Sequence, residues 1–366
     1  MKRLLICTLA ALLLPCAALA DEISTSAKAC VVIDMDSGRI LLEHNANQAL
    51  PMASTTKIMT ALMALESCAL DDVVTAGRNA FGVPGTSIYL DLNEALTMEQ
   101  MLYGLLIASG NDAAVAIAEH VSGSVDEFCR DMTERAREIG CTETIFLTPH
   151  GLPQEGHVTT AYELALITRE AMRHDTFRAI VSTRRATIPW QGREYDRVLN
   201  NKNRLLAEYE GAMGVKTGYT RAAGRCLVTA AERDGMRVIC VVLNCYDWFN
   251  ESERLLDAAF DRWDSIVMVN EGECIRTLDV DGSGGETCGA VVEKDLSGLL
   301  AMGQLPSVSI DLPERLEAPV TAGEVIGEIR LTADGEVIGQ STLLAAETVL
   351  RDTYQSRLER IWLLWR

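Results

Sequence analysis

Alternating and periodic apolar positions divide most of the chain into short strands and amphipathic helices. Two β-rich runs, 29–33 and 39–42, flank an Asp/Ser/Gly turn and predict a hairpin. The apolar runs 226–231 and 236–243 flank Arg233-Asp234-Gly235 and predict a second hairpin of buried strands. Between the hairpins, apolar residues recur at helical spacing, and residues 183–200 have a strand-like pattern. The predicted helices begin near Ser54 and cover 98–109, 112–120, 125–139 and 161–172, with a last helix at 252–260.

Strands at both ends with helices between them predict an α/β (α+β) domain over residues 21–268. The pattern changes near residue 270, where short apolar runs are separated by Gly and Pro. Residues 325–331 and 336–339, joined by Ala333-Asp334-Gly335, have a strand–turn–strand pattern. Residues 269–346 therefore predict a small β-rich domain.

Both ends of the chain differ from these domains. Lys2 and Arg3, a short apolar run and Ala18-Leu19-Ala20 predict a secretory signal peptide over residues 1–20, because the run is too short to span a bilayer comfortably. Residues 347–366 carry apolar and aromatic residues at spacings of three and four, with arginines among them. This pattern predicts an amphipathic helix at the membrane interface; the alternative is a helix that packs on its own protein.

Composition and charge narrow the class of protein. The hydrophobic content of 48% and charged content of 23% are typical of a globular protein. The formal net charge of −19 argues against a nucleic-acid partner, because phosphate binding needs a basic surface. There is no Cys-x-x-Cys motif and no evident cluster of metal ligands, so no metal or other cofactor is expected. Nine cysteines follow the predicted signal peptide, and a Cys274–Cys288 disulfide is one pairing open to them.

The first candidate for chemistry is Ser54-Thr55-Thr56-Lys57 at the start of a predicted helix. Residues at i and i+3 share one face, so the hydroxyl and the amine can meet. Serine becomes a nucleophile when a base takes its proton, and a lysine can be that base if burial or a second cation keeps it neutral. The alternative is that Ser54 only caps a helix and Lys57 lies on the surface.

Two further motifs follow in the chain. Ser109-Gly110-Asn111 lies at a helix junction, where the glycine permits a sharp turn and both polar side chains can enter one cleft. Lys216-Thr217-Gly218, on a predicted strand, offers a cation, a hydroxyl and a close backbone approach. The cation can keep Lys57 neutral by like-charge repulsion. Each motif alone is compatible with ordinary capping residues or a solvated strand end, but the three in this order form a strong signal.

With these motifs in place, the sequence resembles the serine D-alanyl-D-alanine carboxypeptidases, the low-molecular-mass penicillin-binding proteins. The resemblance covers nearly the whole chain and implies a penicillin-binding/β-lactamase-like catalytic domain followed by a β-rich domain. Beyond the three motifs, it rests on Ala108–Ala114, Pro149-His150-Gly151-Leu152, Asn201-Lys202-Asn203, Ala318-Pro319-Val320 and Asp334-Gly335.

The resemblance implies a role for each motif residue. Ser54 is the acylated nucleophile and Lys57 its general base, with Ser109 and Asn111 on the second wall. Lys216, Thr217 and Gly218 bind the substrate, together with Lys202. The oxyanion hole consists of the backbone N–H groups of Ser54 and Tyr219, where many relatives have histidine in place of the tyrosine. His150 and His157 either shape the site or are ordinary loop residues.

The implied activity is removal of the terminal D-Ala from peptidoglycan stem pentapeptides, with penicillins acylating the same serine. This places the protein in cell-wall biogenesis and control of cell shape, exported and attached peripherally to the outer face of the cytoplasmic membrane. A class A-like β-lactamase, a D,D-endopeptidase and a non-catalytic wall-binding protein of the same fold are the alternatives. The chain lacks a Glu-x-x-Leu-Asn run resembling the class A deacylating loop.

Overall fold

The computed structural model describes residues 21–354 and divides the chain into two compact units. The first contains the chain up to Ala231 together with Val238–Leu255, and the second contains Glu232–Arg237 and the chain from Leu256 onward. The second unit begins earlier than the predicted residue 269. The reason is that strand β11 (Trp263–Val269) pairs antiparallel with β14 (Leu296–Ala301), which ties it to the β-rich unit.

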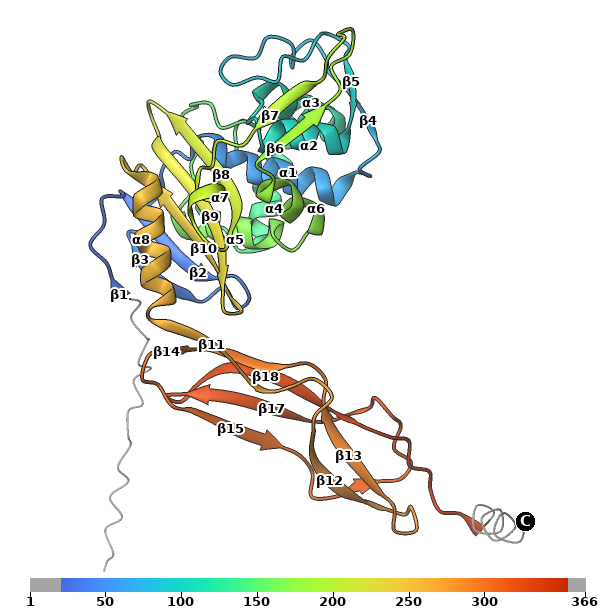
Figure 1. Cartoon of the computed structure of the whole chain (residues 1–366). Helices are drawn as coiled ribbons and strands as arrows, with labels where there is room; N and C mark the ends of the chain where they lie inside the picture. The colour runs from blue at the N-terminus through green and yellow to red at the C-terminus, as the bar shows by residue number, and fades with distance from the viewer. Residues whose placement is uncertain (1–20, 355–366) are drawn as a thin grey trace, which may run out of the picture. The chain divides into compact units, whose positions relative to one another are not determined.

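A six-stranded sheet is the largest sheet of the first unit (Figure 1). Both predicted hairpins are confirmed, because β2 pairs with β3 and β9 lies beside β10. The sheet is antiparallel in its β3–β2, β2–β10 and β8–β9 pairs. Its mostly apolar central strands are buried on both faces, as their continuous hydrophobic runs require. In spatial order the strands are β1 (Asp21–Glu22), β3 (Ile40–His44), β2 (Ala29–Asp34), β10 (Met236–Leu243), β9 (Gly224–Arg233) and β8 (Ala212–Thr220).

Eight α-helices occur in the described part of the chain. Thr97 caps α2 as predicted, since its side chain accepts from the N–H of Gln100 while the Gln100 side chain accepts from the N–H of Thr97. Helix α2 ends before Ser109, which the sequence placed within it. The helices are α1 (Lys57–Ser67), α2 (Met98–Leu106), α3 (Asn111–Ser122), α4 (Val125–Ile139), α5 (Ala161–Ala171), α6 (Asp175–Ser182), α7 (Leu205–Glu208) and α8 (Trp248–Phe260).

A continuous hydrophobic core joins helices α1 to α6 to the sheet. Helix α5 packs on β2, and α1 packs on α2, α3 and α5, so α1 lies near the centre of the core. Burying a single Leu or Met side chain stabilises a fold by roughly 1.5–3 kcal/mol, and most of the apolar face of α1 is fully buried. Two two-stranded antiparallel sheets complete this unit: β4 (Val73–Thr75) with β5 (Ala95–Thr97), and β6 (Arg185–Ile188) with β7 (Arg197–Asn200).

The second unit is built from β-strands, as predicted. The predicted strand–turn–strand at 325–339 is β17 and β18, joined through Asp334 and Gly335, which both have positive φ. Besides the β11–β14 pair, six strands form one sheet around two small apolar clusters. Their order is β15 (Pro306–Asp311), β17 (Val325–Ala333), β18 (Glu336–Ala345), β13 (Thr287–Val292), β12 (Cys274–Asp281) and β16 (Leu316–Glu317).

The features predicted at the two ends of the chain lie largely outside residues 21–354. The signal peptide over 1–20 and the part of the tail from 355 onward lie outside the described residues. Residues 347–353 belong to the predicted tail helix but are not helical, because Val349 pairs with Val320. Within residues 21–354, no helix has the length and hydropathy needed to cross a membrane. All nine cysteines there are unpaired, including Cys274 and Cys288.

Candidate active site

Ser54 lies in a single 3-10 turn, η1 (Ala53–Thr56), and Lys57 begins α1 directly after it. The Nζ atom of Lys57 lies 3.0 Å from Ser54 Oγ, 2.7 Å from Asn111 Oδ1 and 2.9 Å from the carbonyl oxygen of His150. The last two atoms can only accept hydrogen bonds, whereas the Ser54 hydroxyl can also donate. A neutral amine has two N–H donors and one lone pair, so these three partners match a neutral lysine that can accept the Ser54 proton.

The surroundings of Lys57 favour that neutral form. Its side chain is fully buried, and burial is the main reason that its pKa lies well below the usual value. The positive charges of Lys216 and Lys202 lower the pKa of Lys57 further, while the negative charge of Asp112 opposes them. The direction of these effects is the one that the predicted coupling between Lys57 and Lys216 requires.

The turn between α2 and α3 holds the second pair of predicted residues. Ser109 has a positive φ of 65° and is buried, and Asn111 begins α3. The Asn111 side chain donates from Nδ2 to the carbonyl of Pro84 at 2.6 Å, which orients Oδ1 toward Lys57. A Cβ atom on Gly85 would lie 2.7 Å from this Nδ2, so glycine lets the loop approach the amide. In the described structure, no hydrogen bond joins Ser109 to Ser54 or Lys57.

The three residues of the third motif lie on edge strand β8, which runs beside η1. Lys216 is buried and donates to the carbonyl of Thr217 at 3.1 Å. Burial, followed by the charge of Lys202, lowers the pKa of Lys216 to about 7. A Cβ atom on Gly218 would lie 2.9 Å from the backbone nitrogen of Ser54, so only glycine permits this approach. Tyr219 follows directly and has an exposed side chain.

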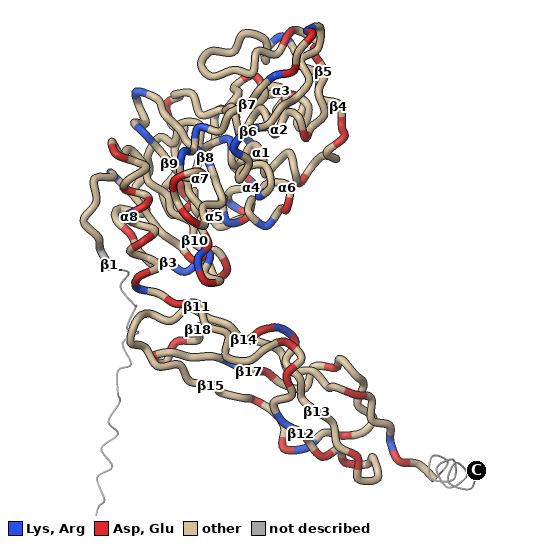
Figure 2. Tube along the Cα trace, in the orientation of Figure 1, with Lys and Arg blue, Asp and Glu red and all other residues tan. Residues whose placement is uncertain are grey.

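Lys202 lies on a loop that its two asparagine neighbours hold in place. Asn201 donates to the carbonyls of Val181 and Thr183, and its own Oδ1 accepts from the N–H of Asn203. Lys202 itself is exposed, yet its charge acts on both buried lysines. The protein is acidic in total, with 52 Asp and Glu against 33 Lys and Arg, and acidic residues occur along both units (Figure 2). Three lysines are therefore gathered at one place on an acidic protein, and each lowers the tendency of its buried neighbours to carry charge.

The loop at 148–158 packs against η1. A Cβ atom on Gly151 would lie 1.8 Å from the carbonyl oxygen of Ala53, and Gly151 has a φ of +84°. Thr60 donates to the carbonyl of Pro149 at 2.6 Å, which fixes the loop to α1 and places the carbonyl of His150 at Lys57. Burial, with the charge of Lys57 as a lesser cause, lowers the pKa of His150 to about 3.

His157 is connected to the serine turn through a chain of hydrogen bonds. Its Nδ1 accepts from the N–H of Leu147 at 2.9 Å, so the ring proton is on Nε2. Nε2 lies 2.9 Å from Thr56 Oγ1, which donates in turn to the carbonyl of Ala53 at 2.8 Å. Burial lowers the pKa of His157 to about 4, so this neutral tautomer persists at neutral pH. The residue thus has a positioning role behind Ser54.

The predicted site residues come together, and the structure adds backbone groups that the sequence did not indicate. Lys57 contacts both Ser54 and Asn111, and Gly218 lies against Ser54. The missed contributors are the carbonyls of Pro84 and His150 and the hydroxyls of Thr56 and Thr60. A carbonyl group is present at every residue, so no residue type could have identified the first two.

Comparison with known proteins agrees with this geometry. The D-alanyl-D-alanine carboxypeptidase family matches residues 16–246, and the penicillin-binding protein 5 C-terminal domain matches residues 263–351. The D-alanyl-D-alanine carboxypeptidase DacF of Bacillus subtilis is 32% identical over 351 residues, covering 93% of this chain and 90% of the relative. DacC of Escherichia coli is 33% identical over 345 residues, covering 89% and 85%.

Solved structures agree as well. Penicillin-binding protein 5 from Haemophilus influenzae superimposes with a TM-score of 0.73 at 28% identity, covering 90% of this chain and 99% of that one. The predicted fold class, a penicillin-binding catalytic domain followed by a β-rich domain, is confirmed. With its family match over most of the first unit and its relatives aligned along both units, the chain belongs to the D-alanyl-D-alanine carboxypeptidase family.

Proposed function

We propose that this chain is a serine D,D-carboxypeptidase that removes the terminal D-Ala from peptidoglycan stem pentapeptides and is inhibited by penicillins. The observation that carries the proposal is the environment of Lys57 Nζ. A buried amine with two acceptor-only partners and one serine hydroxyl at 3.0 Å is arranged as a general base for that serine.

In the acylation step, Ser54 Oγ attacks the carbonyl carbon of the penultimate D-Ala while its proton passes to Lys57 Nζ. The oxyanion that forms accepts hydrogen bonds from the backbone N–H groups of Ser54 and Tyr219, each worth about 10²–10³ in rate. The C–N bond then breaks, the proton on Lys57 passes to the leaving nitrogen, and D-Ala departs. Ser109 relays this proton where the leaving nitrogen lies beyond the reach of Lys57.

In the deacylation step, water takes the place of the leaving D-Ala. Lys57 accepts a proton from the water, the resulting hydroxide adds to the ester carbon, and the bond to Ser54 Oγ breaks as the serine recovers its proton. The product is the shortened peptide with a new carboxylate. A penicillin follows the first step at its lactam carbonyl, and its ring nitrogen stays attached, which leaves a long-lived ester on Ser54.

Substrate recognition follows from the charges and from the edge strand. The terminal carboxylate of the stem peptide is bound by Lys216, Thr217 and Lys202, which supply two cations and a hydroxyl donor. Gly218 brings edge strand β8 directly against the serine turn, so a substrate that pairs with β8 has its backbone beside Ser54. Bound carboxylate also favours the charged form of Lys216, which keeps Lys57 neutral while substrate is present.

The experiment is to incubate the protein with a pentapeptide ending in D-Ala–D-Ala and to measure free D-Ala, then to repeat it with a cross-linked dimer and with a penicillin. We expect D-Ala release, slow cleavage of the dimer, and one stable penicillin adduct per chain. Fast penicillin turnover would indicate a β-lactamase, and preferential dimer cleavage an endopeptidase. Neither D-Ala release nor an adduct would indicate a non-catalytic wall-binding protein and would contradict the proposal.

We also propose that the protein is exported by cleavage after Ala20 and attached to the membrane surface by its C-terminal segment. The support is in the sequence, where residues 355–366 combine Trp, Leu and Ile with three arginines. Sedimentation with anionic vesicles tests the attachment. We expect the full chain to co-sediment and a chain ending at residue 354 to remain in solution; equal sedimentation of both would contradict the attachment.

A further inference from the structure

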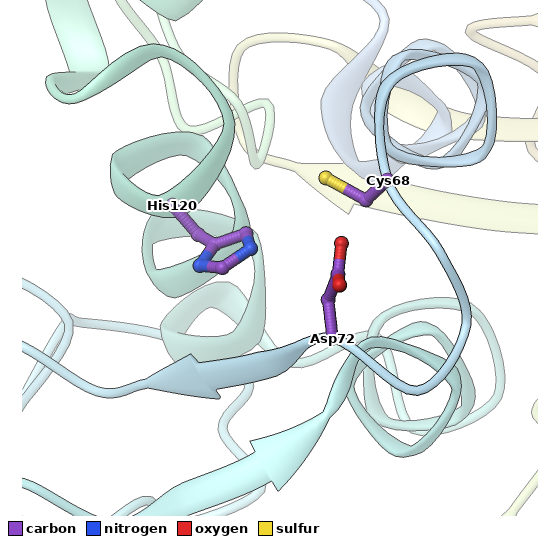
Figure 3. A group of neighbouring side chains, drawn as sticks. All are labelled: Cys68, Asp72 and His120. Carbon is purple, nitrogen blue, oxygen red and sulfur yellow. The ribbon is translucent and has the colours of Figure 1, made fainter.

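A second cluster of reactive side chains lies at the end of α1 away from Ser54. Cys68, Asp72 and His120 each direct a ligand atom into one space, and these atoms all lie within 4.8 Å of one another (Figure 3). Cys68 and Asp72 are partly buried and His120 is exposed, so the space is open to solvent. In residues 21–354 the imidazole of His120 has no hydrogen-bond partner, and the catalytic mechanism uses none of the three residues.

The backbone around the cluster is fixed before any ligand binds. Cys68 follows the last turn of α1, where its N–H donates to the carbonyl of Ala64. The turn that follows is held because Asp72 Oδ2 accepts from the N–H of Ala69 at 2.9 Å, which leaves the second carboxylate oxygen available. The carbonyl of Asp72 accepts from the N–H of Met98 at 2.8 Å. His120 is in the last turn of α3, which packs on α1 and on β4.

We propose that Cys68, Asp72 and His120 bind a zinc ion, with water as the fourth ligand. A thiolate, an imidazole and a carboxylate are the three ligand types that zinc uses in proteins, and ligand atoms this close need only small side-chain shifts to reach tetrahedral geometry. Calcium and magnesium prefer oxygen ligands alone, which two of these three residues do not supply. The hydrogen bond from the N–H of Ala69 to Asp72 provides the outer contact that orients a ligating carboxylate.

Zinc binding must displace the proton of the Cys68 thiol. Burial, and then the nearby charge of Asp72, raises the pKa of this thiol, so the metal-free cysteine is protonated at neutral pH. The bond to zinc forms as the S–H proton leaves to solvent, and no oxidant or reductant takes part.

The position of the site indicates what the metal does. Helices α1 and α3 begin at the catalytic residues Lys57 and Asn111, and they end near Cys68 and His120. A metal at their far ends clamps the two helices together, about 15 Å from the chemistry at the rise of 1.5 Å per residue. Because it binds only the folded chain, zinc at about one hundred times its Kd should raise the Tm by roughly 5–10 °C.

Cobalt titration tests the site, because Co²⁺ replaces zinc and gives a thiolate-to-metal absorption band only when a cysteine binds it. The full protein is reduced with a phosphine, freed of metal and titrated with CoCl₂, and zinc is then added in competition. We expect one Co²⁺ per chain, displaced by one zinc. His120→Ala and Cys68→Ser should each weaken binding by about 100-fold or more, since loss of an outer-shell contact alone weakens it by about 10–100-fold.

Cys274→Ser is the matched control, because Cys274 is the exposed cysteine of the described chain and should leave the titration unchanged. His120 is exposed, so its replacement should leave folding intact, which circular dichroism checks. The proposal is overturned if the thiolate band is absent, if it persists in Cys68→Ser, or if His120→Ala binds as tightly as the parent. Penicillin acylation of the metal-free protein is measured in parallel, so failure at this site is distinguishable from failure of the proposed activity.

Discussion

The two units of the molecule differ in whether they bury ionisable side chains. Within the described residues, every buried ionisable side chain except the cysteine thiols lies in the first unit, whereas the buried polar side chains of the second are two serines, Ser283 and Ser341. In the described residues, a large core surrounds α1 in the first unit, whereas the apolar clusters of the second unit are small. The buried ionisable residues are Asp34, Lys57, Glu94, Asp112, His157, Glu163, Arg197 and Lys216.

The buried acidic residues have donors or cations that stabilise their charge, whereas within residues 21–354 the two buried lysines have no negatively charged partner. Glu94 pairs with Arg197 at 2.6 Å, and Asp112 and Glu163 accept several backbone N–H groups. Lys57 and Lys216 have no ion-pair partner in the described part of the chain. Burying an unpaired charge costs several kcal/mol, which a protein avoids by neutralising the group. The lowered pKa values of both lysines are consistent with this neutralisation, which is the state that the proposed general base requires.

The largest effect is expected at the buried amine itself. Lys57→Met keeps the volume and removes the base, so acylation by penicillin should slow by about 10⁴-fold at neutral pH. Lys294→Met, on the exposed surface of the second unit, is the matched control and should acylate at the parental rate. Stopped-flow measurement of adduct formation checks both variants. Near-normal acylation in Lys57→Met would show that Lys57 is not the general base.

The next largest effect is expected from replacing a glycine in the first unit, and a similar replacement in the second unit is its control. Gly218→Ala puts a Cβ 2.9 Å from Ser54 N and must displace the serine turn, so acylation should fall by about 100-fold. Gly298→Ala creates a similar clash, 2.8 Å from the carbonyl of Ile338, within the second unit. It should lower the free energy of unfolding of that unit and leave acylation unchanged. Equal acylation rates in the two variants would contradict the expectation that only the first unit supports acylation.

The coupling between the lysines should appear in the pH dependence of acylation. Lys216 has a pKa of about 7, so it carries charge mainly below that pH and then holds the pKa of Lys57 down. Lys216→Met should move the acidic limb of the rate profile to higher pH, with about a tenfold slower rate for each pKa unit gained by Lys57. Lys216→Arg restores the charge and should restore the position of the limb. Superimposable profiles for parent and Lys216→Met would exclude the coupling.

The smallest effect on chemistry is expected at His157. Its folded pKa of about 4 is below the unfolded value of about 6.5, so the unfolded chain binds the proton first. Its contribution is complete above pH 6.5 and falls by about 3 kcal/mol as the pH drops toward 4. His157→Gln should flatten this acidic loss and keep acylation at neutral pH, whereas His157→Ala should also slow acylation by loosening the Thr56 contact. Urea unfolding across this pH range measures the difference, and an unchanged slope in His157→Gln would count against it.

The sequence predicted an element well where that element has a clear apolar period or a recognisable turn. The apolar period of 125–139 matched α4 at both ends, and the two hairpins followed from their turns. Helix α6 was missed, although Phe177, Ile180 and Val181 have helical spacing, because polar residues surround this short segment. The domain boundary was placed late because strand β11 differs little in composition from the chain before it; only its pairing with β14 assigns it to the second unit.

The site was predictable to the extent that its residues form local motifs. The i, i+3 relation of Ser54 and Lys57 follows from the sequence, and the structure differs only in placing Ser54 in a 3-10 turn. The meeting of Lys57 with Asn111 depends on the fold and came from motif order and family resemblance. The positive φ of Ala53 and the carbonyl of His150 had no sequence signal. The cluster of Cys68, Asp72 and His120 was missed because His120 lies on a separate helix.

Mass mapping of the penicillin adduct tests the central claim, that Ser54 is a nucleophile activated by a neutral Lys57. The parent, Ser54→Ala and Lys57→Met are each exposed to penicillin for the same short time, digested and analysed by tandem mass spectrometry. We expect one adduct per parent chain, on Ser54, none in Ser54→Ala, and only a trace in Lys57→Met. An adduct on another residue, or full labelling of Ser54 in Lys57→Met, would contradict it.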